Sequence, residues 1–142
     1  MKTNALIVLK TQSHTLSQIS KVIGITPDPD SPAKGDLVTG GLSRFQNRYS
    51  STAWTLGLPR ARASGLNKTI NSLLAMLPND FASRLKSMRG VKGYLSIALC
   101  NLNLVDSTVI SSATLKRVMQ CGLSLELKVF SPKSFAITTL EP

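Results

Sequence analysis

Apolar and polar positions follow two different periods along the chain, and each change of period predicts a new element. Residues 5–10 are almost continuously apolar, which is typical of a central strand in a covered sheet. The next apolar stripe has helical spacing. Thr15 and Gln18 form a capping-box pattern at its start, and Gly24 ends it. The chain therefore begins with a strand and a short helix.

The segment 26–52 shows neither period. Three prolines within six residues exclude a helix at its start, and Gly35, Gly40 and Gly41 add turns. The pattern leaves room only for a short edge strand at 36–39. Because a loop this long is uncommon inside a compact domain, we expect it to be functional or mobile.

Strand and helix periods then alternate as far as residue 130. Residues 51–58 alternate as a strand around Trp54, which we expect to be a core residue. A helix begins near residue 67 and is broken by Pro78, and a second helical segment ends at Gly90. The remaining elements are a long strand at 91–104, a helix capped by Ser111 or Ser112 that ends at 121–122, and a strand at 123–130.

The order of these elements predicts the fold class. Strands and helices alternate without a repeat, which favours a single α+β domain over residues 1–142. We expect a mixed or antiparallel sheet with helices packed on one face, of ferredoxin-like character. Residues 26–52 form its irregular loop, and residues 131–142 form a tail that either adds a strand or frays. The strand order does not follow from the sequence.

The charge of the chain is strongly positive and uneven. The formal net charge is +10, and residues 44–92 carry nine Lys and Arg against Asp80 alone. A protein this basic is attracted to acidic protein surfaces or to polyanions. We expect an acidic protein surface as the partner. Nucleic acid is the alternative with less support, because aromatic residues make up 5% of the chain and no RNP-like motif is present.

The candidate binding surface lies in this basic segment. Arginines beside aromatic residues suit stacking combined with contacts to carboxylate or phosphate groups. A solvated surface on a basic protein would explain the same residues without any function. The candidate partner-binding residues are Arg44, Phe45, Arg48, Tyr49, Arg60, Arg62, Arg84, Lys86 and Arg89.

The sequence contains no recognisable catalytic or metal-binding constellation. His14 is the only histidine, and Cys100 and Cys121 do not form a C-x-x-C pair, so an ordinary zinc site is not supported. Phosphate-binding glycine motifs and the nucleophile elbow are missing. The aspartates of the 26–52 loop lack the glycine and distal glutamate of a calcium loop. We therefore expect a protein that is not an enzyme and needs no metal or cofactor.

The apolar runs of the chain are short. The longest, residues 5–9, falls below the roughly 7–15 apolar residues of a signal-peptide core and the roughly 20 of a membrane span. Two cysteines agree with buried free thiols in a reducing compartment. These features favour a cytoplasmic protein with no membrane segment.

Five landmarks follow one another along the chain. They are an opening strand and helix that end in Ile23-Gly24-Ile25-Thr26-Pro27, then Lys34-Gly35-Asp36, then Ala53-Trp54-Thr55-Leu56, then the long pair of helical segments, and last Leu115 with Cys121-Gly122-Leu123-Ser124-Leu125-Glu126-Leu127. In this order they resemble the bacterial family known as domain of unknown function 4279, over about residues 5–130. The strong positive charge departs from the family, whose members usually carry more acidic residues. The resemblance implies a compact α+β fold, a bacterial origin and no known activity. By analogy with similar small bacterial domains, we expect a protein-binding module of the immunity or inhibitor-like kind.

Overall fold

The computed structural model describes residues 2–37, 48–58, 65–100 and 108–130. Its elements follow the order that the sequence pattern predicts. They are β1 (Lys2–Thr11), α1 (Leu16–Ile23), β2 (Thr52–Leu56), α2 (Leu66–Ala75), α3 (Phe81–Ser87), β3 (Val91–Cys100), α4 (Ser112–Gln120) and β4 (Ser124–Phe130). The end of the strand expected at 91–104 and the tail at 131–142 lie outside the described residues.

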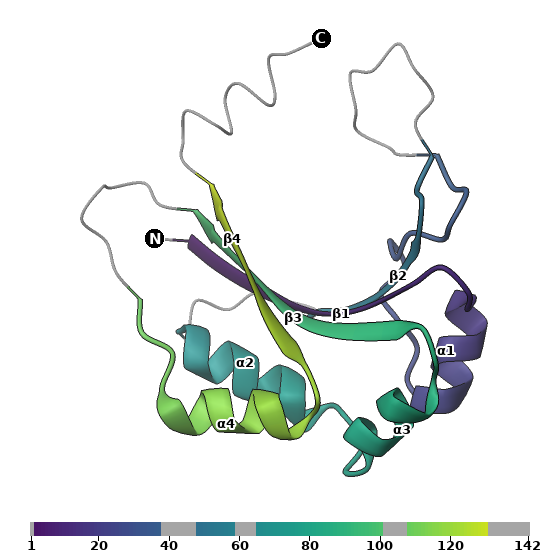
Figure 1. Ribbon diagram of the computed structural model, residues 1–142. Coiled ribbons are helices and arrows are strands. Elements are labelled where there is room, and N and C mark those ends of the chain that lie inside the picture. The colour runs from purple at the N-terminus through teal and green to yellow at the C-terminus, as the bar shows by residue number, and fades with distance from the viewer. Residues whose placement is uncertain (1, 38–47, 59–64, 101–107, 131–142) are drawn as a thin grey trace, which may run out of the picture.

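The four strands form one mixed sheet in the order β2-β1-β3-β4. β1 is antiparallel to both of its neighbours, and β3 runs parallel to β4. All four helices lie on one face of this curved sheet, on its convex side (Figure 1). The prediction of an α+β fold with a mixed or antiparallel sheet and helices on one face is therefore confirmed, and the sheet is the mixed kind. β1 is central as expected.

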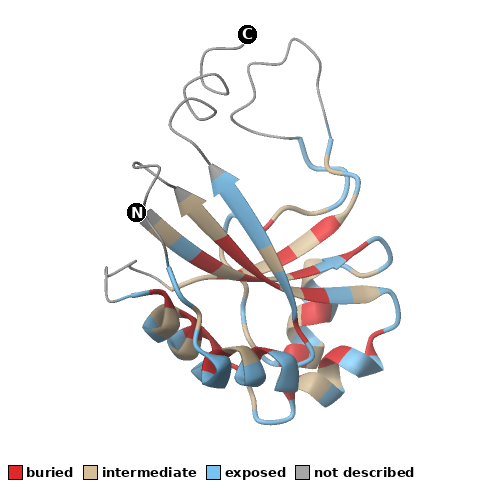
Figure 2. Cartoon of the chain, turned by 60° about the vertical axis from the view of Figure 1, so that its left-hand side comes forward, coloured by how far each residue is buried: buried red, intermediate tan, exposed pale blue. Residues whose placement is uncertain are grey.

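The core lies between the sheet and the helices. In each strand every second side chain faces the helices, so that Leu9 of β1, Trp54 of β2 and Gly93 of β3 form one buried row. Ile19, Ile70 and Phe81 fill the same core from the helical layer (Figure 2). The opposite face of β1 also carries apolar residues, Leu6 and Val8. Both are only half-buried, because none of the four described helices packs on that side.

The proline-rich start of the long loop runs along the outer edge of β2. The Asp28 N–H donates to the Thr55 carbonyl at 2.8 Å, and the Ala53 N–H donates to the Pro32 carbonyl at 2.9 Å. The Ser31 hydroxyl, which is buried, accepts from the Thr55 N–H at 3.1 Å. These bonds satisfy backbone groups that an edge strand otherwise leaves free.

The same loop returns toward β2 as a short antiparallel stem. The Gly35 N–H donates to the Tyr49 carbonyl, and the Tyr49 N–H donates to the Asp36 carbonyl, both at 2.9 Å. Of the short strand expected at 36–39, the structure shows an isolated bridge between Leu37 and Arg48. Residues 38–39 lie outside the described residues.

Local signals fix both ends of α1 and the start of α4 where the sequence pattern predicts. The Thr15 hydroxyl accepts from the Gln18 N–H at 3.2 Å while the Gln18 side chain accepts from the Thr15 N–H at 2.9 Å, so the capping box is complete. Gly24 ends α1 with a φ of 81°, and Ser111 caps α4. No helix within the described ranges is long and apolar enough to cross a membrane.

Replacing Trp54 by Ala is expected to lower the free energy of unfolding by about 3–5 kcal/mol. Trp54 has no exposed surface, and its indole N–H donates to the Ser20 hydroxyl at 3.1 Å. Denaturant unfolding should separate the packing of the indole ring from its hydrogen bond. Ser20→Ala removes only the hydrogen bond and should lower the free energy of unfolding by about 1 kcal/mol. An unchanged midpoint for Trp54→Ala would contradict the core assignment.

Candidate functional site

The residues expected to bind a partner divide between described and undescribed parts of the chain. Arg44, Phe45, Arg60 and Arg62 lie outside the described residues. Arg48 and Tyr49 lie in the loop stem beside β2, whereas Arg84, Lys86 and Arg89 lie on or just after α3. In Figure 1 the loop stem lies beyond the β2 edge of the sheet, whereas α3 lies under its convex face. The described members of the set therefore do not form one continuous cluster.

Arg48 and Tyr49 stabilise the loop stem. The Arg48 guanidinium donates to the Gly35 carbonyl at 2.7 Å. Tyr49 exchanges backbone hydrogen bonds with the Gly35–Asp36 segment and is half-buried. Arg48 is exposed, so its side chain remains open to solvent on one side.

Arg84 links two helices. Its Nη1 donates to the Ile23 carbonyl at 3.0 Å and to the Val22 carbonyl at 3.3 Å, and its Nε lies 2.8 Å from an Asp80 carboxylate oxygen. The hydrogen bond from Arg84 lowers the pKa of Asp80. A cation at the carboxyl end of a helix satisfies free carbonyls and interacts favourably with the helix dipole. Arg84 thus fastens α3 to the end of α1, a role that local sequence does not reveal.

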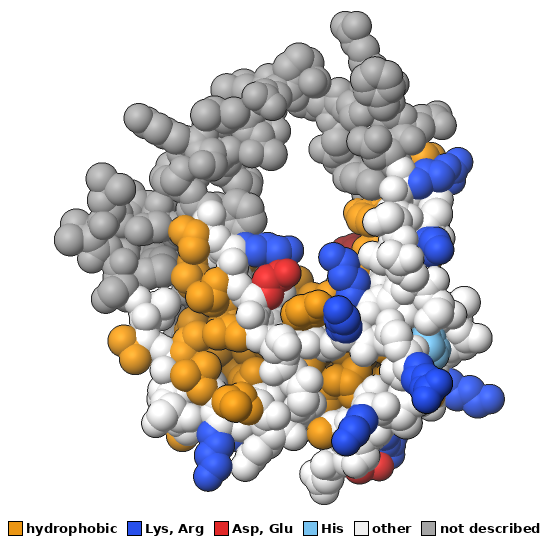
Figure 3. All heavy atoms as spheres, viewed as in Figure 1, with side chains coloured by type: hydrophobic (Ala, Val, Ile, Leu, Met, Phe, Trp, Pro, Cys, Tyr) orange, Lys and Arg blue, Asp and Glu red, His pale blue; other side chains and the backbone are white. Residues whose placement is uncertain are grey.

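The open face of the sheet, which we define as the face away from the four helices, carries a pair of opposed lysines. Lys10 of β1 lies directly opposite Lys92 of β3 in the antiparallel register, and both are exposed. Tyr94, two positions along β3, is half-buried on the same face. In Figure 3, some of the Lys and Arg side chains lie on the concave side of the sheet, and others lie along the right-hand and lower margins of the molecule.

A hollow of about 470 Å³ opens beside this lysine pair. Residues with hydroxyl groups dominate the rest of its lining, which includes the end of β1 and the turn that follows. The hollow is lined by Lys10, Thr11, Gln12, Ser13, Ser50, Ser51, Gly90, Lys92 and Tyr94.

Hydrogen bonds fix the turn after β1, which lines the hollow. The Ser13 N–H donates to the Thr11 hydroxyl at 3.1 Å, and the Ser13 hydroxyl lies 3.0 Å from Nδ1 of His14. Gly90 has a φ of 79°, and a Cβ there would lie 3.2 Å from the Ser13 hydroxyl oxygen. The turn before β3 and the turn after β1 therefore approach closely and bring Lys10 and Lys92 to the same end of the sheet.

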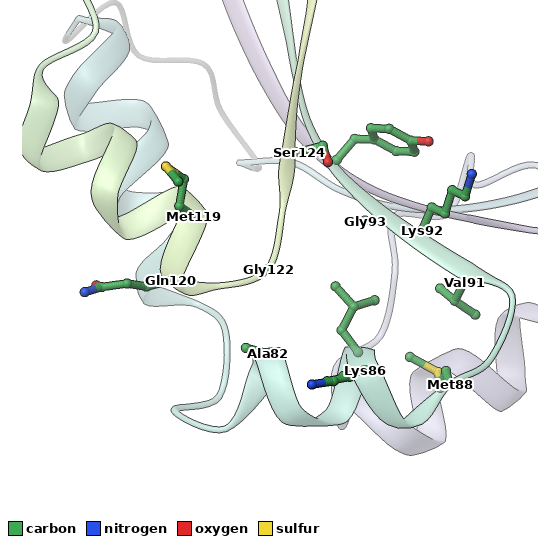
Figure 4. Close-up of a pocket in the computed structure, with 12 residues that line it drawn as sticks. Ala82, Lys86, Met88, Val91, Lys92, Gly93, Met119, Gln120, Gly122 and Ser124 are labelled. Carbon is green, nitrogen blue, oxygen red and sulfur yellow. The ribbon is translucent and has the colours of Figure 1, made fainter.

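A second hollow, of about 570 Å³, lies between α3, the start of β3 and the α4–β4 turn (Figure 4). Met88 and Val91 give it an apolar wall, and Lys86 from the candidate set lines it. The lining is closely packed at Gly93, because a Cβ there would lie 2.8 Å from the Leu85 and Leu123 side chains. This hollow shares Lys92 and Tyr94 with the first, but no acid–base pair converges on it.

Within the described strands, Glu126 is the acidic side chain of the open face. Glu126 of β4 accepts a 2.9 Å hydrogen bond from the Ser96 hydroxyl and lies 3.4 Å from the Lys128 ammonium. The Ser96 hydrogen bond is the main cause of the lowered pKa of Glu126, and Lys128 and Lys10 lower it further. Glu126 is consequently ionised near neutral pH, and the described strands still leave this face net positive.

The described residues do not support a metal site or a reactive cysteine. Within the described ranges, no three His, Cys, Asp or Glu side chains lie close enough together to hold a metal ion. Cys121 is a half-buried free thiol, and burial raises its pKa, which lowers its thiolate fraction at neutral pH.

Sequence reasoning missed the pairing of Lys10 with Lys92. The available signal was weak: Lys10 ends the first apolar run, and Lys92 stands second in a predicted strand. Eighty-two positions separate them, and only the β1–β3 register, which the sequence does not specify, places them opposite each other.

The model of a known protein family, described as Domain of unknown function (DUF4279), matches residues 1–131 of the 142. The chain belongs to this family. No curated protein and no solved structure matches the chain. The family resemblance expected from the sequence is therefore confirmed. The open face of this DUF4279 domain is interpreted from its own residues.

For this DUF4279 domain, Arg84→Met should lower the free energy of unfolding by about 1–2 kcal/mol, because the last carbonyls of α1 lose a charged donor. Arg89→Met is the matched control. It removes the same charge from an exposed position just after α3, so the change should stay within about 0.5 kcal/mol. Equal denaturation midpoints for the two variants would show that Arg84 does not fasten the helices.

Removing the Ser96 hydroxyl should raise the pKa of Glu126 toward its ordinary value. A carboxyl group whose pKa is lower in the folded state stabilises the fold at pH values above its pKa in the unfolded state. This stability is lost as the pH falls through its pKa in the folded state. Ser96→Ala should therefore weaken the acid-side dependence of stability. A carboxyl NMR titration measures the shift directly. Ser124→Ala, on the same face of β4, should leave the Glu126 titration unchanged, and equal effects of the two variants would refute the assignment.

Proposed function

We propose that this DUF4279 domain is a non-catalytic binding module whose open sheet face takes an acidic segment of a partner protein. The observation that carries this proposal is the opposed pair Lys10 and Lys92 beside a hollow rich in hydroxyl groups. The proposal makes the open face the main contact surface. The exposed basic side chains Arg48, Lys86 and Arg89 are secondary candidates for contacts at its periphery.

The lysine pair supports an anionic ligand on energetic grounds. Like charges directly opposite each other in an antiparallel pair are destabilising. A carboxylate placed between the two ammonium groups would replace this repulsion by two charge-assisted hydrogen bonds. Ser50 and Ser51 line the same hollow, and their hydroxyls are further potential donors. The free protein is therefore poised to gain stability when an acidic group binds.

An acidic protein segment fits this face better than nucleic acid. A nucleic-acid chain presents a continuous row of phosphates, and the ionised Glu126 on the same face would repel such a row. Tyr94 is half-buried, so its ring is not a free stacking platform of the kind that single strands use. An acidic peptide, in contrast, can place single carboxylates at the lysines and avoid Glu126.

The chemistry of the open face favours binding over catalysis. General acid–base catalysis needs a group whose pKa lies near the working pH. Glu126 has a lowered pKa, which moves it away from that range. The proposal therefore assigns no reaction to this face.

The proposal includes a biological role for the binding module. A small basic domain that covers an acidic surface suits an inhibitor-like or immunity role inside a bacterial cytoplasm. The net charge of +10 supports fast association with an acidic partner by electrostatic steering.

Charge reversal at the lysine pair tests the proposed surface. The double variant Lys10→Glu with Lys92→Glu lowers the net charge from +10 by four units to +6. Its affinity for a polyglutamate peptide in fluorescence anisotropy should fall by about tenfold or more, because two charge-assisted contacts are lost. A duplex DNA of matched charge, titrated in parallel, tests the nucleic-acid alternative.

The matched control is Lys21→Glu with Lys68→Glu, which reaches the same net charge from exposed positions on α1 and α2. It should change the affinity by less than about threefold, since long-range attraction alone is altered. An equal loss of peptide affinity in both double variants would contradict the proposed surface, because binding would then depend only on the net charge of the protein. Tighter binding of DNA than of the peptide, with steep salt dependence, would favour the polyanion alternative.

A further inference from the structure

The edge strand β4 presents an unusual amount of apolar surface. Leu125, Leu127 and Val129 alternate on its helix-facing side and are 40%, 54% and 69% exposed. Met119 of α4, just before the turn into β4, is 76% exposed. Apolar side chains gather over β4 and α4 in Figure 3, and most of β4 is drawn as exposed in Figure 2.

The two edges of the sheet differ in how they are covered. The outer edge of β2 is paired with the 28–34 segment, which satisfies its backbone groups. Among the described residues, β4 pairs only with β3, so its other edge has no strand partner there. A long apolar edge of this kind is a template for pairing with another strand.

The charges of β4 match one mode of self-pairing. When two antiparallel copies of Ser124–Phe130 overlap along their full length, Leu127 lies opposite Leu127 of the second copy. Leu125 then lies opposite Val129, and Glu126 lies opposite Lys128, on both sides of the two-fold axis. A shift of one copy by two residues in either direction opposes Glu126 to Glu126 or Lys128 to Lys128. The register that pairs the whole strand is therefore also the one that pairs opposite charges.

We propose that two copies of this chain associate through antiparallel pairing of β4 with β4, centred on Leu127. The two four-stranded sheets then join into one continuous sheet. The two-fold axis is perpendicular to that sheet, so both helical layers lie on one side and both open faces lie on the other. The apolar stripes of the two β4 strands cover each other. This inference does not depend on the proposed function, because it rests on the outer edge of β4 and uses neither Lys10 nor Lys92.

Mass measurement by sedimentation equilibrium of the full chain tests the proposal, with a concentration-dependent dimer as the expected result. Glu126→Lys opposes lysine to lysine at two places in the dimer, and Lys128→Glu opposes glutamate to glutamate. Each single variant should weaken dimerisation by about tenfold to a hundredfold. Mixing the two variants restores both opposite-charge pairs, so a heterodimer should form with close to wild-type affinity.

Leu127→Lys provides a second variant, which places two lysines against each other at the axis. Because this side chain is half exposed, the fold should persist, and circular dichroism and the unfolding midpoint check that it does. A wild-type chain that stays monomeric at all attainable concentrations would overturn the proposal and leave the edge for a strand of another protein. A dimer that these variants leave unchanged would overturn it as well.

Discussion

Alternation along the central strand β1 is the constraint on which the rest of the structure depends. β1 is paired along both edges, so its side chains can only face the helices or the opposite side. Ile7 and Leu9 have no exposed surface and form the centre of the core with Trp54 and Leu95. The alternate positions, which include Lys10, are thereby forced onto the open face.

This constraint also creates the candidate site. The antiparallel register that buries Leu9 against Gly93 is the one that brings Lys10 opposite Lys92. Gly93 has no side chain, so Leu85 and Leu123 can pack against the backbone there, and the start of β3 stays close to α3. The repulsion between the two lysines is a small cost beside the burial of the core row, which explains how the fold tolerates it.

Much of the fold could be predicted because its signals are local. Thr15, Gly24 and Ser111 act within one turn of the chain, and the alternation around Trp54 is visible in a short stretch of sequence. The pairing of distant strands has no such signal. The candidate site could not be predicted for the same reason, since Lys10 and Lys92 meet only through the strand order. Arg84 was expected at a binding surface, yet it contacts carbonyl groups of α1, more than sixty positions away.

The most direct test of the central claim is an NMR titration of the full chain with a short polyaspartate peptide, followed through the backbone amides. We predict saturable shifts at Lys10, Thr11, Lys92 and Tyr94, with smaller changes on the outer surfaces of the four helices. Shifts confined to the helical layer, or spread evenly over all basic residues, would contradict the account that the open sheet face is the binding surface.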